Sequence, residues 1–432
     1  MARRMKDSGI EWIGEIPEEW EISKVSYFYE VQLGKMLQPQ KKSETDTEEK
    51  YLCAANVGKN SLSLDTLKTM WFSQTEKHQF DLKEGDLLVV EGGDVASCAI
   101  IETPVRNLFF QNALHRVRPL HNESVAFLRY WLMTAKSYGY IDFICNKATI
   151  AHFSKEKFIA LPIPVIPQDI QSKIVSFLDL ECKQIDDLLS KSRSSIEEYK
   201  KLKQAVITQA VTKGVRGERE MKDSGVEWIG EIASDYFIYK LKYLLREPLK
   251  YGANESGIPY SPALPRYIRI TDITLDGKLK SSGKLSLTEE SAKDYLLEHG
   301  DILLARSGAT VGKSFIYYRC YGHAAYAGYL IKASFHEHIL PKFVYYFTCS
   351  SLYEIWKNSI FIQSTIQNIG ADRYANLPLP VPNSLQEQQE IADYLDVKCA
   401  EIDGLIAKKE QLVKELESYK KSLIYEVVTG KR

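Results

Sequence analysis

The sequence predicts an α+β fold in which two tandem α/β domains are separated by two long helices that form an antiparallel coiled coil. The first observation is an internal duplication, because residues 5–16 return at 221–232 with a single change, Ile10 to Val226. The offset of 216 residues is half of the 432-residue chain, which is the size of a domain rather than of a solenoid repeat. A proline-rich segment and a 4-3 apolar periodicity near the end of each half complete the prediction.

The duplication extends over the whole chain at nearly the same offset. The matching segments are Tyr51–Val57 with Tyr267–Ile273, Gly85–Leu88 with Gly300–Leu303, Thr149-Ile150 with Thr365-Ile366, Leu161–Pro164 with Leu377–Pro380, and Cys182–Asp186 with Cys399–Asp403. Between these segments the two halves differ widely. We therefore expect a pseudo-two-fold arrangement of two related parts, and a function that needs both.

Each half opens with about 150 residues of mixed pattern, typical of an α+β globule. Short apolar runs bounded by glycine predict buried strands, and β-branched or aromatic runs predict further strands. The expected strands are 86–90, 267–273, 301–305 and 315–318, and the expected helices are 127–135 and 341–356.

A proline-rich segment ends each globular part, at residues 161–167 and 377–382. Proline lacks an amide donor and disfavours helix before it, so these segments predict extended chain. Apolar positions then alternate at spacings of four and three, from Leu178 to Val206 and from Leu395 to Leu423, which is the seam of a coiled coil. We expect the two helices to pack on each other in antiparallel fashion; the alternative is that each folds back on its own globule.

The composition, 44% hydrophobic and 26% charged, is typical of a globular protein. No run reaches the ~18 apolar residues of a membrane helix, and no apolar stretch follows Arg3 and Arg4, so we expect neither a membrane span nor a secretory signal. The seven cysteines are scattered without a Cys-x-x-Cys pair. This pattern predicts reduced thiols in a cytoplasmic protein and argues against zinc.

The net charge of −1 argues against a simple, wholly basic nucleic-acid binder. However, residues 240–284 hold nine Lys or Arg against four Asp or Glu, a local excess of +5. A basic region on a neutral chain fits a protein that holds DNA together with partner subunits. The alternative is a solvated charged loop.

Residues 306–314 form a glycine-rich loop that resembles a phosphate-binding loop but departs from it twice. Ser307 stands where the first glycine is required, and the following residues predict a strand where a helix should begin. The matching first-half loop, residues 91–98, has no lysine. We therefore do not expect nucleotide binding, although Arg306, Ser307, Thr310 and Lys313 are suited to DNA phosphates or a guanine edge.

Residues 111–118 combine amide, imidazole and guanidinium groups, which are suited to base edges and phosphates. The corresponding second-half segment, 324–332, has different chemistry. Two related parts that differ at polar loop positions indicate two recognition specificities; drift on an unused surface is the alternative.

Motifs for catalysis are missing from the sequence. It has no Asn-Pro-Pro-Tyr or Asp-Pro-Pro-Tyr loop for adenine methylation, no Gly-x-Gly for a nucleotide-like cofactor, and no Gly-x-Ser-x-Gly elbow. A Pro-Asp…Glu-x-Lys nuclease core is also absent. We expect a non-enzymatic chain without a cofactor or a metal.

Together these residues resemble the specificity subunit of type I restriction-modification enzymes. The resemblance rests on the repeated Trp-Ile-Gly-Glu-Ile, the Gly-Asp-Leu/Ile-Leu strand before a glycine loop, the Thr-Ile pairs and the Leu-Pro-x-Pro segments. It also rests on residues 386–391 and on the helix end 419–430, and it covers essentially the whole chain. The first half departs from it at 167–171, which lacks the Glu-Gln pair of Glu387 and Gln388.

The resemblance implies two target recognition domains, at 1–160 and 217–376, and two spacer helices, at 161–216 and 377–432. Its implied partners are double-stranded DNA, two methyltransferase subunits and, through the complex, restriction subunits. The expected DNA-contacting residues are Lys35, Asn56, Gly92, Gly93, His115, Arg116, Arg118, Thr149, Tyr251, Arg269, Arg306, Ser307, Thr310, Lys313, Thr365 and Gln367. Two alternatives remain open, a coiled-coil adaptor that binds protein partners and an unrecognised enzyme.

Overall fold

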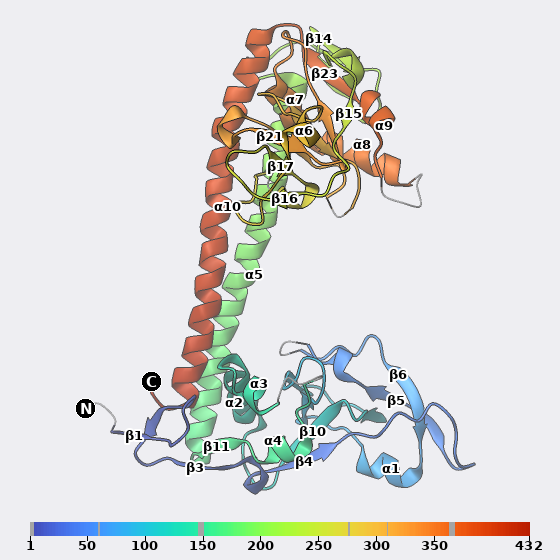
Figure 1. Ribbon diagram of the computed structural model, residues 1–432. Helices are drawn as coiled ribbons and strands as arrows, with labels where there is room; N and C mark the ends of the chain where they lie inside the picture. Colours follow the sequence, from blue (N-terminus) through green and yellow to red (C-terminus); the bar gives the residue numbers. More distant parts are fainter. Residues whose placement is uncertain (1–3, 59–60, 146–150, 275–276, 309, 363–367) are drawn as a thin grey trace. The chain divides into compact units, whose positions relative to one another are not determined.

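The computed structural model describes residues 4–58, 61–145, 151–274, 277–308, 310–362 and 368–432 (Figure 1). The chain divides into two compact units. Unit 1 contains Met1–Ser192 and Gln411–Arg432, and unit 2 contains Arg193–Glu410. Each unit therefore holds one globular part together with a portion of both long helices.

The globular part of unit 1 contains a four-stranded antiparallel sheet and a three-stranded sheet. The first sheet has the order β4-β10-β7-β8, formed by Tyr29–Leu33, Leu114–Pro119, Leu87–Val90 and Cys98–Ile100. The second has the order β6-β5-β9, formed by Lys68–Phe72, Thr47–Leu52 and Leu108–Phe110, with β5 and β9 parallel. Two-stranded pairs join β1 (Met5–Asp7) to β2 (Glu15–Pro17) and β3 (Glu21–Lys24) to β11 (Pro162–Val165).

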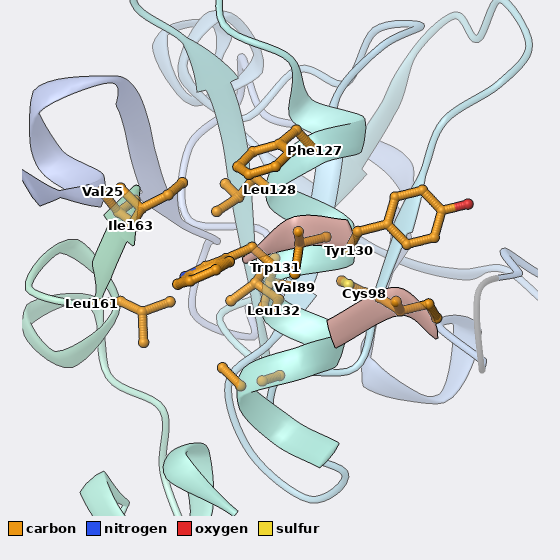
Figure 2. Close-up of a cluster of buried hydrophobic side chains, with 14 of the residues drawn as sticks. Val25, Val89, Cys98, Phe127, Leu128, Tyr130, Trp131, Leu132, Leu161 and Ile163 are labelled. Carbon is orange, nitrogen blue, oxygen red and sulfur yellow. The ribbon is translucent and has the colours of Figure 1, made fainter. Parts of the chain in front are cut away.

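Short helices complete this part. They are α1 (Gln74–Gln79), α2 (Val125–Ser137), α3 (Tyr140–Ile144) and α4 (Lys155–Ile159). Helix α2 carries the main core, in which Trp131 packs with Phe127, Leu128 and Leu161 and donates a 2.7 Å hydrogen bond to the carbonyl of Pro162 (Figure 2). This core also includes residues of both long helices.

Unit 2 repeats this arrangement. Its antiparallel sheet has the order β15-β22-β19-β20, formed by Lys250–Tyr251, Leu330–Ala333, Ile302–Ala305 and Ser314–Ile316. Its second sheet has the order β16-β18-β17-β21, formed by Ile258–Pro259, Leu285–Ser286, Arg266–Ile268 and Ala324–Tyr326. The pairs are β12 (Met221–Asp223) with β13 (Glu231–Ala233) and β14 (Tyr236–Lys240) with β23 (Pro378–Pro382), and the helices are α6 (Glu289–Ala292), α7 (Pro341–Thr348), α8 (Ser351–Ile362) and α9 (Ala371–Ala375).

The register of the parallel strand pair is the same in both units. Lys50 lies opposite Leu108 in unit 1, and Arg266 lies opposite Ala324 in unit 2, so both members are displaced by the same 216 residues. The duplication predicted from the sequence is confirmed at the level of strand pairing.

Most of the expected elements are confirmed, and three are corrected, the first being the strand expected at 315–318, which is β20 and ends at Ile316. Strands β7 and β19 and helix α2 lie where the apolar runs placed them, and the proline-rich segments are the edge strands β11 and β23. The strand expected at 267–273 ends at Ile268, because Asp272 caps a 3-10 turn by accepting a 2.8 Å hydrogen bond from the Arg269 amide. The helix expected at 341–356 is two helices, separated between Thr348 and Ser351.

The long helices α5 (Gln168–Lys213) and α10 (Leu385–Val428) pack on each other within each unit (Figure 1). In unit 1 Lys420 forms an ion pair with Asp186 at 2.6 Å, and in unit 2 Lys203 forms the equivalent pair with Asp403 at 2.7 Å. In unit 2, Arg216, just beyond α5, pairs with Glu390 near the start of α10, which shows the antiparallel direction. Every expected seam residue is buried or half-buried, so the coiled-coil prediction is confirmed.

The start of each long helix is fixed by the same glutamine contact. Gln388 accepts a 2.8 Å hydrogen bond from the Leu340 amide, and Gln171 accepts a 3.0 Å hydrogen bond from the Ser124 amide. Unit 1 therefore keeps this contact although its sequence departs here from the family pattern. What differs is the preceding residue, which is Ile170 in unit 1 and the buried Glu387 in unit 2.

Candidate nucleic-acid interface

In each unit, four chain segments meet beside the antiparallel sheet and form what we call the four-segment site. They are the residues after the first strand of the sheet, the loop after its central strand, the turn before β10 or β22, and a segment that precedes α4 or α9. In unit 1 they are Gly34-Lys35, Glu91–Gly93, Gln111–Leu114 and Ala151–Phe153, and in unit 2 Gly252-Ala253, Arg306–Gly308, Ala327–Leu330 and Asn368–Gly370.

Backbone hydrogen bonds hold the four segments in the same way in both units. In unit 1 the Glu91 amide donates to the Ala113 carbonyl at 2.9 Å, and the Glu91 carbonyl accepts from the Phe153 amide at 2.8 Å. In unit 2 the Arg306 amide donates to the Tyr329 carbonyl at 3.1 Å, and the Arg306 carbonyl accepts from the Ile369 amide at 2.8 Å. Glu91 and Arg306 therefore occupy the same position in the two copies of the fold.

Two glycines allow the first and third segments to approach each other. A Cβ atom on Gly34 would lie 2.2 Å from the carbonyl oxygen of Gln111, and one on Gly252 would lie 2.5 Å from that of Ala327. Both distances are far below a van der Waals contact, so only glycine fits. The sequence analysis missed these residues, although their place directly after a strand in both halves was a usable signal.

The side chains of the site in unit 2 are aromatic and basic. The guanidinium carbon of Arg306 lies 4.8 Å from the centre of the Tyr251 ring, a cation–π contact, and the Tyr251 hydroxyl accepts a 3.0 Å hydrogen bond from the Ala371 amide. Nε of Arg306 is buried and has no hydrogen-bond partner among the described residues. Tyr329 beside it is 62% exposed. The site therefore presents an oriented guanidinium that forms no ion pair with a described residue.

The side chains of the site in unit 1 are of the opposite kind. Glu91 contacts His152, with 3.2 Å between Oε2 and Nδ1, and both side chains are partly exposed. Gly92 lies against His152 in an isolated bridge, and Gly93, at φ +93°, has open space where a side chain would lie. Glu91 was also missed by the sequence analysis, which considered amides and cations but no carboxylate.

Four of the expected first-half residues are held inside the fold and are removed from the candidate interface. His115 is fully buried in β10, where its Nε2 lies 2.7 Å from the Phe153 carbonyl and burial lowers its pKa. Arg116 is buried and donates to the carbonyl of Asp81 at 2.8 Å. Lys35 is buried and pairs with Glu76, and Asn56 is buried and caps a 3-10 turn by accepting from the Cys53 amide at 3.0 Å.

Two of the expected arginines are tied to acidic side chains. Arg118 donates two hydrogen bonds to Asp86, at 2.5 and 2.7 Å, and this contact is the main cause that raises its pKa. Arg269 contacts Asp272 at 2.9 Å, and the hydrogen bond between them raises its pKa too. Arg118 lies in strand β10 and Arg269 at the start of a 3-10 turn, and both charges are engaged by acidic side chains of the same unit.

The remaining candidates lie at or beside the four-segment site of unit 2, or outside the described residues. Ser307 bridges to Asn368, and Thr310 accepts a backbone hydrogen bond of 3.0 Å from Lys313 in the turn that leads into β20. This turn leads into strand β20, so it is not followed by the helix that a phosphate-binding loop requires. Thr149, Thr365 and Gln367 fall outside the described residues.

Two features are absent from the described part of the chain. Within it, no helix combines the length and apolar character needed to cross a bilayer. In the same residues, no three His, Cys, Asp or Glu side chains are arranged to hold a metal ion.

Comparisons with known proteins place this architecture in a family. The model of the type I restriction modification DNA specificity domain matches residues 17–198 and 266–415, one region in each half. The MjaVIII specificity subunit of Methanocaldococcus jannaschii is 26% identical over 302 residues, which cover 65% of this chain and 64% of that subunit. The putative MjaX specificity subunit of the same organism is 24% identical over 97% of this chain and 95% of its own.

The likeness to solved structures concerns the fold. A chain from a structure on complex assembly and conformational transition of the type I R-M system matches with a TM-score of 0.71 at 12% identity, covering 96% of this chain and 98% of its own. The HsdS subunit from Thermoanaerobacter tengcongensis matches over the same shares with a TM-score of 0.52 at 13% identity. Because the family model covers well over half of the chain and both of its copies, this chain belongs to the family of type I restriction-modification DNA specificity subunits.

Proposed function

We propose that this chain is the DNA-specificity subunit of a type I restriction-modification complex and that it recognises a bipartite, asymmetric DNA target. Residues 1–160 and 217–376 would be the two target recognition domains, each reading one half of the target. Residues 161–216 and 377–432 would form the spacer helices, whose length sets the gap between the half-sites. The family membership and the repeated four-segment site support this assignment.

The observation that carries the proposal is that identical backbone scaffolds present unlike side chains. Glu91 and His152 in unit 1 correspond to Arg306 and Asn368 in unit 2, while the surrounding backbone hydrogen bonds are the same. Base edges in the major groove differ in their donors and acceptors, so unlike side chains at one position select unlike bases. A palindromic target would instead require the same set of base-contacting side chains in both units.

The partner subunits of the complex would supply the catalytic motifs that are missing from this sequence. We propose that two methyltransferase subunits bind the chain, that restriction subunits join through the complex, and that the assembly acts in the cytoplasm. The chain itself would be non-catalytic and would need no cofactor. Its near-neutral net charge fits this division, because the partner subunits would share the neutralisation of DNA phosphates.

The test is to co-express the full chain with its cognate methyltransferase subunit and to map N6-methyladenine in the host genome by single-molecule sequencing. A new split motif with two different halves is the expected result. A stable complex without new methylation would contradict a working recognition surface. The absence of any complex would favour the adaptor function instead.

A further inference from the structure

We propose that Glu91 determines specificity in unit 1 by accepting a hydrogen bond from the exocyclic amino group of a cytosine or an adenine. This inference rests on the proposed function and names the chemistry of one half-site. Arg306, at the same place in unit 2, would do the reverse and donate to the acceptors of a guanine. The two units would thus use opposite charges at one scaffold position.

The backbone makes the position of Glu91 independent of its side chain. Its amide donates to the Ala113 carbonyl, and its carbonyl accepts from the Phe153 amide. The two equivalent hydrogen bonds hold Arg306 in unit 2. The side chain is therefore free to differ between units without disturbing the loop. A residue whose backbone is structural and whose side chain is partly exposed is well suited to carry specificity.

A neighbour of Glu91 orients its carboxylate but leaves one of the two carboxylate oxygens available as an acceptor. His152 approaches one oxygen, Oε2, at 3.2 Å, and Oε1 has no partner among the described residues. A carboxylate oxygen accepts hydrogen bonds but cannot donate them, so it suits the amino groups of cytosine and adenine and repels the acceptors of guanine and thymine. Gly92 and Gly93 follow directly, and at Gly93 no side chain fills the adjacent space.

The environment in unit 2 has changed together with the charge. Arg306 stacks on Tyr251, whereas Leu33, which precedes Gly34 as Tyr251 precedes Gly252, has no aromatic ring. Stacking holds a guanidinium plane in a fixed direction, which bidentate pairing with guanine needs. A carboxylate gains nothing from such a ring and is oriented by a histidine instead. The residue at the scaffold position and the residue that orients it therefore differ in a consistent way between the units: Glu91 with His152 in unit 1, and Arg306 with Tyr251 in unit 2.

The experiment uses the full chain in complex with its methyltransferase subunits. The methylated motif is mapped for the wild type, for Glu91→Ala and for Glu102→Gln. Glu102 is an exposed carboxylate just beyond the far end of β8, so it is the matched control. We expect Glu91→Ala to relax one base pair in one half-site and to leave the other half-site unchanged, and we expect Glu102→Gln to change neither.

A binding assay then identifies the atom that is read. At the relaxed base pair, the cytosine is replaced by 2-pyrimidinone or the adenine by purine, each of which lacks the amino group. The wild-type complex should lose on the order of tenfold to a hundredfold in affinity, and Glu91→Ala should lose little more, because it has already lost the contact. The Glu102→Gln complex should behave as the wild type, and the loss that Glu91→Ala still shows measures the effect of the weakened base pair itself. Which analogue acts decides between cytosine and adenine.

The outcomes separate this inference from the proposed function. If the wild type methylates no new motif, the proposed function fails. If the wild type methylates a split motif and Glu91→Ala methylates the same one, or if the analogue costs both complexes equally, the inference on Glu91 fails alone. Glu91→Gln is measured in parallel because it keeps the size of the side chain; if Glu91→Ala does not fold, a Glu91→Gln complex with unchanged specificity refutes the inference.

Discussion

Glu387 offers a direct test of how burial controls the strength of an ion pair in this fold. In unit 2 its side chain is 3% exposed and accepts hydrogen bonds from Arg219 and, at 2.8 Å, from the Tyr236 hydroxyl. Three residues later, Glu390 accepts from Arg216 at 2.6 Å but is 37% exposed. The two carboxylates lie on the same helix and both contact Arg216, Glu387 at 3.4 Å, but Glu387 is buried and has Arg219 as a second cationic partner.

The expected effect of Glu387→Ala follows from what it leaves behind. The buried Tyr236 hydroxyl loses its acceptor, and the Arg219 guanidinium, 18% exposed, keeps its contact with Asp235 and its cation–π contact with the Tyr236 ring. Removing one partner of a buried ion pair costs about 3–5 kcal/mol, and we expect the lower end because water can reach Arg219. For a unit of roughly 200 residues, about 3 kcal/mol lowers the melting temperature by roughly 6–12 °C.

The assay is urea and thermal unfolding of the full chain, with Glu390→Gln as the matched control. Exposed ion pairs contribute little because water competes for both partners, so the control should unfold almost as the wild type does. An equal and small effect of both variants would refute the reasoning, since burial would then make no difference. A large loss of stability in Glu390→Gln would also refute it, because an exposed ion pair would then contribute much more than expected.

Three further predictions concern recognition, spacing and pH. Arg306→Ala should relax only the half-site read by unit 2, lowering the discrimination between bases there by tenfold to about a hundredfold. Arg319→Ala, beyond the far end of β20, is the control and should change neither half-site. If Arg306→Ala instead weakens binding equally for all DNA sequences and makes its salt dependence shallower, Arg306 contacts a phosphate. Adding seven residues to both α5 and α10 should lengthen the gap in the methylated motif by about three base pairs, at ~1.5 Å per helical residue, and an altered half-site would contradict the spacer proposal. Lys250, aided by Lys332, lowers the pKa of Glu247 to about 2, so the ionised Glu247 carboxylate stabilises the fold above about pH 4.5, and this stabilisation is lost as the pH falls toward 2. In urea unfolding, the wild type should therefore be more stable than Glu247→Gln at pH 6, and the difference should shrink toward pH 3. A difference that stays constant with pH would show that the ion pair is not its cause.

The elements that the sequence predicted best are those governed by local pattern. Every position that the 4-3 spacing assigned to the seam of the long helices is buried or half-buried, because a helix fixes which residues share a face. Gly-bounded apolar runs located β7 and β19, since a strand covered on both faces has no polar alternation to obscure it. The duplication predicted two related parts, and the antiparallel sheets β4-β10-β7-β8 and β15-β22-β19-β20 do correspond strand for strand, whereas the second sheet of unit 2 has one additional edge strand, β16.

The choice of surface residues could not be predicted in this way. The polar run that ends in His115, Arg116 and Arg118 suggested a DNA-facing loop, but β10 lies between β4 and β7, so these side chains are used inside the fold. Their partners, such as Phe153, Asp81 and Asp86, are more than 30 residues away in the chain. Polarity alone does not reveal whether a distant partner will be present.

The sequence by itself determined the duplicated architecture, the two helices and the family, because repeats and periodicities are properties of the chain. The sequence paired the loops 91–98 and 306–314, but it did not show what Glu91 and Arg306 have in common, because their side chains carry opposite charges. Only the tertiary structure showed that both residues make the same backbone hydrogen bonds, Glu91 to Ala113 and Arg306 to Tyr329, and so occupy the same position in the fold of their units. Such bonds depend on segments that meet only after folding, which is why the position that we propose to set specificity emerged from the fold.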